Sequence, residues 1–523
     1  MKNIKIFNCL LLIFILFSFC KRPKINYDET KEARGIWVTR WEWARDNIKN
    51  NPRAQKERII KIFDLVKKAR FNFILFQIRG NGDAFYQSNY EPWSDLLTGK
   101  LGKNPGWDPL AFAIEQAQLR GLELHAWINT FPAWLGPSPP PHTNPEHIYN
   151  AHPEWIVCDK NGDPMSLNSH YVNLSPGIPA VRNYIHKVCL DIIKNYDIDG
   201  FHFDYIRYPE KSHELGYSQD AVSMRLFNSP DGNPKNLKWD DWQRENINKF
   251  VRKFYDEATA FKPWLKISAA VIGKYDYSIW NGYHVVYQDA LQWIKEEKID
   301  FIAPMIYWQT DHPTAPFGKI TKDWLKNYHR ARYIFPGMSI NKLGTQNWQV
   351  DEVLKQTTIT RQYGSNGMVF FSFSGLEKAM SLFPNNGFQY LANFPPMSWK
   401  DNNPPMDPMN LKAQFLSSTK IKLEWAFLDS SLEPDDVYRY NIYRSLSSPV
   451  DITKAGNLIH ITTNAQPVYI DNSIKSEHSY YYVVTALDRV NNQSPPSNEV
   501  EVYFPSIVER DSSRFVYHSF TKP

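Results

Sequence analysis

The chain of 523 residues is poor in cysteine and has no excess of either charge. Only four cysteines are present, and two of them, Cys9 and Cys20, lie in the first 20 residues. The remaining pair, Cys158 and Cys189, cannot form a four-cysteine zinc site or a disulfide-rich scaffold. One disulfide and two separate thiols are both open alternatives for this pair. The 60 basic and 55 acidic residues balance too evenly for a dedicated nucleic-acid binder, so we expect no nucleic-acid partner.

Several catalytic signatures are missing as well. The sequence has no GxSxG nucleophile elbow, no HExxH zinc motif, no phosphate-binding P-loop and no dinucleotide fingerprint. It also has no internal repeat and no low-complexity tract. Aromatic residues, by contrast, make up 15% of the chain, with 18 Trp and 29 Tyr. Such a content suits surfaces that stack on sugar rings or nucleobases, although a large core also consumes Trp.

The N-terminus predicts export. A short basic start, MKNIK, precedes an apolar run at 9–19 that is too short to span a bilayer comfortably. The run ends at Cys20 and resembles a bacterial lipobox, which implies a signal peptide at 1–20 and lipidation of Cys20. We therefore expect an exported, membrane-anchored lipoprotein in the periplasm or outer membrane. An uncleaved N-terminal anchor is the alternative.

Residues 33–394 alternate short apolar runs with longer helical patterns. Strands are predicted at 35–39, 72–78, 122–128, 200–205, 266–272, 301–307, 333–337 and 368–373, with helices between them. Eight such units predict an α/β fold of the (β/α)8 TIM-barrel type. A doubly wound sheet is the alternative, but its glycine-rich turn is absent after the first strand, which reads RGIWVTRWEW.

The C-terminal part changes character. A proline-rich stretch at 395–408 predicts a stiff linker, and strands without helices follow at 409–505, before a tail at 506–523. This pattern predicts a small all-β sandwich. Trp425, Tyr440 and the segments 480–488 and 494–497 make it resemble a fibronectin type III domain. We expect the barrel to fold alone, and the sandwich to support it or to contact the cell wall or a protein.

Polar side chains gather where neighbouring strands end. Period-two alternation places one face of each strand inside the barrel, and the interior meets water at the carboxyl ends of the strands. The predicted inward or loop residues are Arg79, Asp83, His125, Trp127, Asn129, His202, Asp204, Tyr307, Trp308 and Gln309. Each has a structural alternative, since a single buried His is usually a core residue and Asp204 can pair with Arg207 or Arg79. Together they predict a catalytic end of the barrel.

Glycoside hydrolysis suits this set of residues. It needs two carboxylates, one protonated as the acid and one ionised as nucleophile or base, and aromatic surfaces bind the sugar rings. A polysaccharide is then the partner, and no cofactor or metal is required. Two alternatives remain, namely a non-catalytic carbohydrate-binding protein with the same aromatic surfaces and a metal-dependent polysaccharide deacetylase.

The chain resembles the bacterial glycosyl-hydrolase-like family ten. The resemblance rests on the segments ARGIWVT, FQIRGNGDAFY, RGLELHAWIN, YDIDGFHFDYIRYP, IDFIAPMIYWQ and GMVFFSFSG. It implies an exported barrel acting on peptidoglycan or a similar cell-wall polysaccharide. It also implies Asp204 as the leading catalytic carboxylate and Asp83, His125, Trp127, Tyr307 and Trp308 as site residues. Many relatives have two consecutive acids where this chain has Asp204 and Tyr205, so the second carboxylate is open among Asp83, Glu91 and Asp311.

Overall fold

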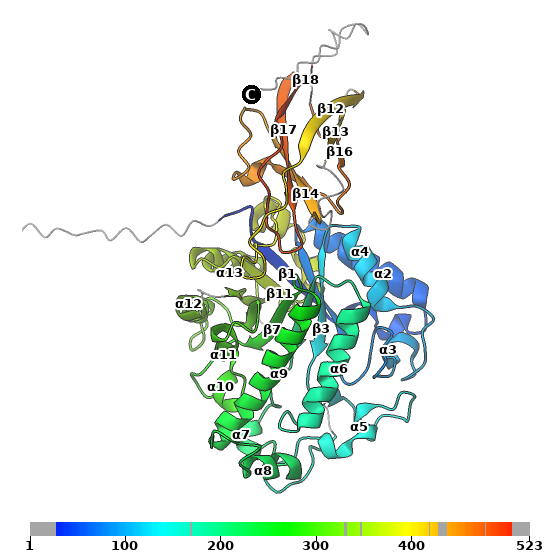
Figure 1. The fold of residues 1–523 in the computed structure, drawn as a ribbon, viewed down its shortest axis with the longest axis vertical. Coiled ribbons are helices and arrows are strands. Elements are labelled where there is room, and N and C mark those ends of the chain that lie inside the picture. Colours follow the sequence, from blue (N-terminus) through cyan, green and yellow to red (C-terminus); the bar gives the residue numbers. More distant parts are fainter. Residues whose placement is uncertain are drawn as a thin grey trace, which may run out of the picture.

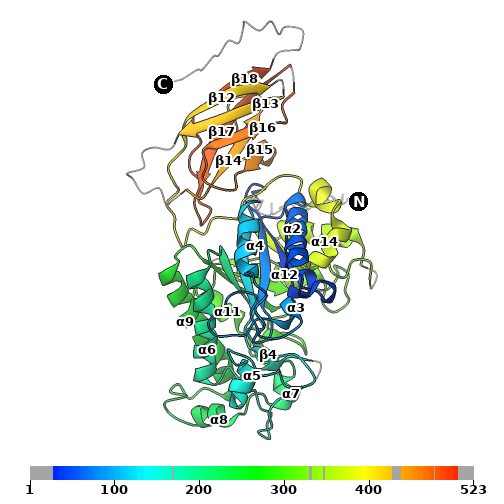
Figure 2. The ribbon, with the colours of Figure 1, turned by 90° about the vertical axis from the view of Figure 1, so that its right-hand side faces the viewer.

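The computed structural model describes residues 28–504 except 168–169, 329–331, 346–347, 418, 427–436 and 476. The signal segment with Cys20 and the tail at 506–523 lie outside the described residues. Two parts stack along the long axis of the molecule, a barrel of alternating strands and helices and a smaller part of strands alone (Figures 1 and 2). No helix in the described residues is both long enough and apolar enough to cross a membrane.

A closed parallel barrel forms the larger part, as the sequence predicts. Its strands are β1 (Ala33–Val38), β2 (Phe73–Arg79), β3 (Glu123–Asn129), β6 (Gly200–Asp204), β7 (Lys266–Ile272), β8 (Phe301–Met305), β9 (Tyr333–Ile334) with β10 (Gly337–Ser339), and β11 (Gly367–Phe371). They pair in the order β10-β11-β1-β2-β3-β6-β7-β8-β9, and β10 also pairs with β8, which closes the ring. The strand predicted at 333–337 is divided because Pro336 has no N–H for the ladder.

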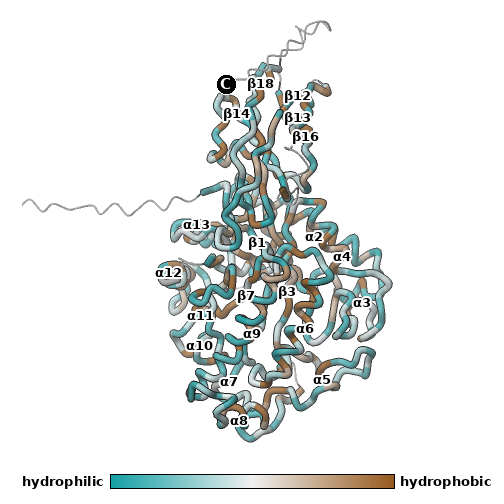
Figure 3. Tube along the Cα trace, in the orientation of Figure 1, coloured by the Kyte–Doolittle hydropathy of each residue, from teal (hydrophilic) through white to brown (hydrophobic). Residues whose placement is uncertain are grey.

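Helices surround the barrel. The longer ones are α2 (Pro52–Lys68), α4 (Pro109–Gln118), α6 (Pro179–Asn195), α9 (Trp239–Phe261), α11 (Ala290–Lys295), α12 (Phe317–Tyr328), α13 (Val350–Gln362) and α14 (Phe373–Ala379). Two of them begin in the same way, with an Asn51 or Asp108 side chain that accepts a hydrogen bond from the backbone N–H of N3 and with Pro at the next position. Hydrophobic residues alternate with hydrophilic ones along these helices (Figure 3), so each helix turns an apolar side toward the sheet.

The barrel has an outer and an inner core. The outer core lies between strands and helices, and the inner core fills the barrel with residues such as Trp37, Phe73, Trp127 and Phe301. The barrel interior is therefore filled with side chains, and a ligand can reach the barrel only at the ends of the strands.

The C-terminal part consists of two antiparallel sheets. One holds β12 (Met409–Ser417), β13 (Lys420–Ala426) and β16 (Val468–Asp471). The other holds β15 (Leu458–Ile461), β14 (Arg439–Ser445), β17 (His478–Leu487) and β18 (Val500–Phe504). Residues of both sheets share one core, which includes Leu423, Tyr440 and Val484. We refer to this part as the sandwich.

The sandwich lies against the amino ends of the barrel strands. Asn491 donates a hydrogen bond to Glu123 at the start of β3 (3.0 Å), and Lys266 at the start of β7 donates to the carbonyl of Arg489 (2.8 Å). Val490, which lies between Arg489 and Asn491 in the sequence, is buried in the inner core of the barrel. Within the stretch predicted as a linker, Met397 is also buried there. The opposite end of the barrel, where the strands finish, is left to the connecting loops.

Candidate active site

The carboxyl ends of the barrel strands, here called the mouth, lie at the end farthest from the sandwich (Figure 1). Two long connections reach this end. The one after β3, residues 130–174, contains α5 (Ile148–Ala151) and the short pair β4 (Pro132–Trp134) and β5 (Val172–Asn173). The one after β6 contains α7 (Ser212–Leu215) and α8 (Ala221–Phe227). Long loops at this end of a barrel commonly carry the functional side chains.

Asp204 is the last residue of β6 and lies at the mouth. Its carbonyl accepts hydrogen bonds from the backbone N–H (2.8 Å) and the hydroxyl (2.9 Å) of Thr130, which join the ends of β6 and β3. Its Oδ1 accepts from the backbone N–H of Tyr205 (2.6 Å) and from Arg207 (3.4 Å). Oδ2 has no hydrogen-bond partner among the described residues. One carboxylate oxygen is therefore held and the other is available.

The backbone after Asp204 turns sharply. Tyr205 has a φ of 49°, in the left-handed region that costs a non-glycine residue energy. The turn brings the Arg207 guanidinium over the Tyr205 ring, 4.3 Å from its centroid, and Tyr171 of the β3 connection packs against the same ring at 5.2 Å. Asp204 thus lies beside one cation, Arg207, and the phenol of Tyr205, and Tyr171 packs on that phenol from the β3 connection.

Burial dominates the electrostatics of Asp204. Only 8% of the residue is exposed, and this burial raises the pKa of its carboxyl above the ordinary value, although Arg207 and the Tyr205 N–H act in the opposite direction. The pKa of the Tyr307 hydroxyl is also raised well above its usual range, first by burial and then by the charge of Asp204. Tyr307, on the loop after β8, therefore lies close to Asp204. A carboxyl with a raised pKa is suited to donate a proton.

The loop after β8 contributes aromatic rings to the mouth, as predicted from the sequence order. The Tyr307 ring stacks on Phe371 at the end of β11, with centroids 5.6 Å apart. Trp308 is half-buried and lies under the ammonium of Lys274, 4.9 Å from its ring centroid. Gln309 is half-buried, and its carbonyl accepts a hydrogen bond from the N–H of Phe317 (3.0 Å).

Two predicted histidines lie inside the barrel, below the mouth. His202 accepts a hydrogen bond from Trp37 at Nε2 (3.1 Å), so its Nδ1 donates to Ser268 (2.8 Å) and the ring is neutral. Burial lowers its pKa well below the ordinary value. His125 bonds Glu123 (3.2 Å) near the amino end and packs on Phe73. Both are fully buried, so neither side chain is exposed at the mouth.

Trp127 and Asn129 line the interior between those histidines and the mouth. Trp127 is 3% exposed and packs in the inner core. Asn129 is the last residue of β3 and is buried. Its side chain accepts from Gln77 (3.2 Å) and donates to the carbonyl of Gly80 (2.9 Å). Asn129 therefore fixes the loop that follows β2.

Arg79 does not reach Asp204, because β2 leaves regular alternation at its end. Gln77 pairs with Trp127, but Arg79 pairs with Ile128, one position short of the regular register. The Arg79 side chain is fully buried and forms a bidentate ion pair with Glu91, with N–O distances of 2.7 to 3.0 Å. Arg79 and Glu91 therefore have a structural role in holding the loop after β2. The cation beside Asp204 is Arg207 instead.

The remaining candidates for a second carboxylate, Asp83 and Asp311, lie on the loops after β2 and β8. Asp83 is buried, and its Oδ1 accepts from the backbone N–H groups of Gly80 (3.2 Å) and Asn81 (2.9 Å), which shapes the turn after β2. Asp311 is exposed on the loop after β8. Neither forms a hydrogen bond with Asp204 or with its partners Tyr205 and Arg207 among the described residues. Asp204 lies at a strand end and has one carboxylate oxygen without a hydrogen-bond partner among the described residues.

Two further mouth residues, Arg40 and Trp41, escape the sequence analysis. Arg40, at the start of α1 (Arg40–Trp43) after β1, donates to the Tyr171 hydroxyl (2.9 Å) and lies 4.6 Å from the Trp41 ring centroid. Trp41 is 48% exposed, which leaves a large aromatic surface for a ligand. These residues follow β1 in the segment TRWEW, and their position directly after a strand is the signal that could have found them.

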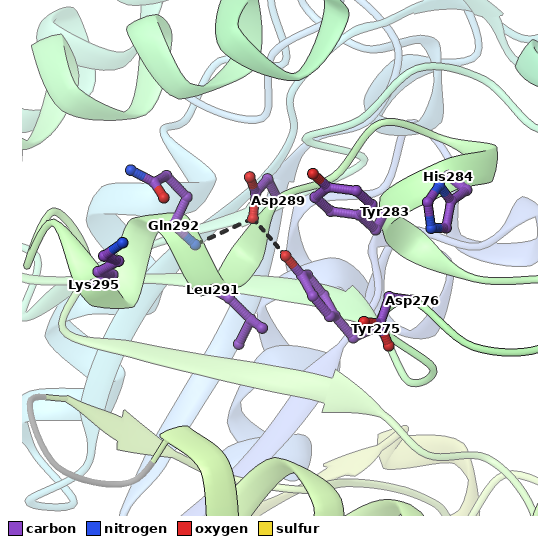
Figure 4. A pocket seen from close by; sticks show the side chains of 8 residues that line it. All are labelled: Tyr275, Asp276, Tyr283, His284, Asp289, Leu291, Gln292 and Lys295. Atoms are coloured by element: carbon purple, nitrogen blue, oxygen red, sulfur yellow. Dashed lines mark hydrogen bonds between the residues drawn. The ribbon is translucent and has the colours of Figure 1, made fainter. Parts of the chain in front are cut away.

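A separate hollow of about 410 Å³ lies on the side of the barrel (Figure 4). The loop after β7, α10 (Gly282–Val285) and α11 form it, and its lining includes Tyr275, Tyr283, Asp289 and Lys295. The Tyr275 hydroxyl donates to Asp289 (2.7 Å). No residue predicted for the site lines this hollow. Among the described residues, no group of three or more His, Cys, Asp or Glu side chains is arranged to hold a metal ion.

The (β/α)8 barrel carries a carboxylate, phenols and cations at the ends of its strands. These features define the class of the protein, a barrel of the kind that carries hydrolase sites. The chain belongs to the family Glycosyl hydrolase-like 10, which matches residues 32–354. It is 29% identical over 503 residues to "Glycosyl hydrolase YngK" of Bacillus subtilis (strain 168), covering 90% of this chain and 94% of that protein.

Other similar proteins carry the same description. "Glycosyl hydrolase DigH" of Escherichia coli (strain K12) is 27% identical over 357 residues, covering 62% of this chain and 76% of that protein. Among solved structures, the PgaB (BpsB) glycoside hydrolase domain from Bordetella bronchiseptica has a TM-score of 0.49 and 13% identity, covering 68% of this chain and 99% of that one. The family match marks the chain as glycosyl-hydrolase-like.

Proposed function

We propose that the protein is an exported glycoside hydrolase that cleaves a bacterial cell-wall glycan, peptidoglycan or a similar polysaccharide, at the mouth of its barrel. The observation that carries the proposal is Asp204, at the end of β6, with a raised pKa and an unpaired Oδ2. Family membership supports the hydrolase class. Exposed Trp41 and half-buried Trp308 supply ring surfaces on which sugars stack.

The sequence predicts Asp204 as nucleophile or general base and Asp83 as its acid partner, but the raised pKa of Asp204 favours the opposite assignment, in which Asp204 acts first as the general acid. Its protonated carboxyl donates a proton to the glycosidic oxygen, and the bond from that oxygen to the anomeric carbon breaks as positive charge develops on the sugar ring. Water, or the second carboxylate followed by water, then forms the new bond to the anomeric carbon. Arg207 and the Tyr205 N–H keep the carboxylate oriented and stabilise it once the proton has left. Asp83 is our first candidate for the second carboxylate, since it lies in the loop after β2, which is separated from β6 only by β3.

A digestion assay tests the proposal. Purified protein is incubated with cell-wall glycan, and the new reducing ends and the product masses are measured. Asp204→Asn keeps the size of the side chain but removes the proton donor, so turnover should fall by about 10³ to 10⁵, or roughly 4–7 kcal/mol of barrier at ~1.4 kcal/mol per tenfold. The matched control is Asp256→Asn on the outer surface of α9, where the carboxylate pairs with Lys298.

The outcomes separate the candidate functions. Normal turnover in folded Asp204→Asn protein removes this residue from the mechanism. Binding of glycan without any turnover by the unsubstituted protein favours the non-catalytic carbohydrate-binding alternative. Loss of activity on adding a chelator favours the metal-dependent deacetylase. Asp83→Asn tests the second carboxylate, because a purely structural Asp83 would lose stability but keep turnover in the folded fraction.

Export and lipidation are part of the same proposal. They are supported by the basic start, the short apolar run and Cys20 in the sequence. Cys20→Ala should move the protein from the membrane fraction to the soluble fraction of the same compartment. Mature protein with an uncleaved leader and an unmodified Cys20 would contradict lipidation. A contact of the sandwich with the cell wall or with a protein stays a prediction.

A further inference from the structure

Lys274 is a nearly buried cation at the mouth without a carboxylate beside it. It follows the end of β7 by two residues and is 9% exposed. Its Nζ donates to the Ser278 hydroxyl (3.3 Å) and lies 4.9 Å from the Trp308 ring centroid. Gly273 allows this approach, since a Cβ there would lie 2.4 Å from the Met305 carbonyl oxygen and 3.1 Å from the Trp308 ring. The backbone is thus shaped to bring the ammonium over that ring.

Lys342 is a second cation without a carboxylate beside it. It is half-buried and lies on the other side of the loop after β8. It follows the end of β10 by three residues, and its Nζ donates to the carbonyl of Tyr307 (2.9 Å). Its ammonium also lies 5.4 Å from the Trp348 ring centroid. Burial lowers the pKa of Lys342, and no acidic neighbour offsets this effect. Lys274 and Lys342 therefore contact the consecutive residues Trp308 and Tyr307.

The two ammonium groups leave the mouth with uncompensated positive charge. No carboxylate among the described residues lies within ion-pair distance of either lysine, and the nearby Arg207 already contacts Asp204. Taking a cation out of water without an anion is unfavourable, so partly buried cations are usually paired in folded proteins. Both lysines instead lie beside aromatic rings, and a ring surface next to a cation suits a sugar that carries an acid group.

We propose that Lys274 and Lys342, on either side of the loop that carries Tyr307 and Trp308, form a subsite for a sugar residue that bears a carboxylate, so that the glycan bound at the mouth is acidic. This inference rests on the proposed function and specifies its substrate class. In it, the carboxylate of the sugar supplies the missing counter-charge to the two ammonium groups, the sugar ring packs near Trp308, and Tyr307 links the subsite to Asp204.

Binding measurements test the subsite independently of turnover. The probe is an oligosaccharide of alternating uronic acid and N-acetylhexosamine, compared with the same oligosaccharide after its carboxyl groups have been reduced to alcohols. Both are titrated into the full-length Asp204→Asn protein by calorimetry, so that no hydrolysis interferes. Lys274→Gln and Lys342→Gln are then introduced singly, because glutamine keeps a hydrogen-bond donor but removes the charge. Lys295→Gln is the matched control, since Lys295 lines the hollow on the barrel side (Figure 4).

We expect the lysine substitutions to weaken binding of the acidic oligosaccharide only. The acidic form should bind at least tenfold more tightly than the reduced form, and each lysine substitution should weaken binding of the acidic form by roughly tenfold, the usual worth of a bond to a charged group. Binding of the reduced form should not change. Lys342→Arg should restore most of the affinity if charge is the cause, and a melting curve of each variant checks that it is folded.

Three outcomes would overturn the subsite. They are equal affinity for the two oligosaccharides, equal losses for both on lysine substitution, and a loss with Lys295→Gln as large as those at the mouth. A different result would contradict the proposed function while leaving the subsite intact. Acid-dependent binding that requires both lysines, without turnover of any glycan by the unsubstituted protein, would contradict hydrolysis and support the subsite.

Discussion

Asp204 is buried beside a single cation, and this setting determines how its charge affects stability. Burial raises the pKa of the carboxyl in the folded protein above its unfolded value of 3.8, and Arg207 offsets only part of this effect. The folded state therefore holds the proton more tightly than the unfolded state. The resulting contribution to stability is complete below pH 3.8 and is lost as the pH rises through the folded pKa.

Asp204→Asn should therefore stabilise the protein at neutral pH. The variant carries no charge to desolvate, so its melting temperature should exceed that of the unsubstituted protein at pH 7, and the difference should shrink as the pH falls toward 4. Melting curves from pH 4 to pH 8 check this. A variant that is less stable at pH 7 would show that the bond with Arg207 outweighs the burial of the carboxylate.

Individual side chains show where the period-two alternation of strand residues predicts side-chain positions correctly and where it does not. It places Asp204 at a strand end, and the structure has it there. It also turns Gln77 and Arg79 to one face, but the register shift between them sends Arg79 to Glu91. Period-two alternation assumes a regular ladder, and nothing in the sequence marks this irregularity. Lys274 and Lys342 are also beyond sequence analysis, because a charged loop residue is normally solvated and only packing shows otherwise.

At the scale of the element, the end of β2 and the loop after it are fixed by the buried pair of Arg79 and Glu91. The two side chains are fully buried, and Arg79 also donates to the carbonyls of Asn129 and Thr130. The pair thus ties β2 to β3 and to its own loop. Removing one partner leaves an uncompensated charge in the interior, which costs far more than the pair itself contributes.

Glu91→Gln should accordingly destabilise the protein by about 3–5 kcal/mol, measured by urea unfolding. The matched control is Glu57→Gln on α2, which breaks the exposed pair with Arg53 and should leave the free energy of unfolding nearly unchanged. The double variant Arg79→Met with Glu91→Leu should recover part of the loss, since it removes both charges. Equal effects at Glu91 and Glu57 would contradict this role for the buried pair.

The secondary structure was the most predictable level. Long apolar runs bounded by turns fix the eight barrel strands to within a few residues, because parallel strands are buried on both faces. Helix starts follow from Asn51 and Asp108 followed by Pro. The division of the seventh strand at Pro336 and the short elements in the β3 connection were missed, since two- and three-residue strands have too little pattern to detect.

At the scale of the whole molecule, the sandwich closes the amino end of the barrel. Burial alone would raise the pKa of Glu123, but Lys266, His125 and Arg439 of the sandwich together lower it to about 2. Arg439 also donates to the carbonyl of Gly121 (3.0 Å), and Tyr438 donates to Asp199 (2.8 Å). The sequence predicts a barrel that folds alone, because its helices cover the sheet, but helices do not cover the ends of the strands.

We therefore expect a chain ending at Pro408 to fold with reduced stability. It loses Val490 from the inner core and exposes Glu123 and Lys266, so its melting temperature should fall by roughly 5–10 °C, at about 2–4 °C per kcal/mol for a chain of this size. The full chain should melt in one transition, measured by calorimetry. Two separate transitions, with the first leaving an intact barrel, would show that the two parts are independent.

The described chain also begins at the amino end of the barrel, which the sandwich covers. Asp28, where the described chain begins, precedes β1, and the neighbouring Thr30 and Lys31 pair with Asn393 at the sandwich end of the barrel. A tether attached before Asp28 therefore pulls on the same end that the sandwich occupies. If Cys20 is lipidated as proposed, the described chain leaves the anchor at the end of the barrel opposite the mouth (Figure 1). We then expect the mouth to face away from the membrane, toward polymer that lies at a distance from the point of attachment.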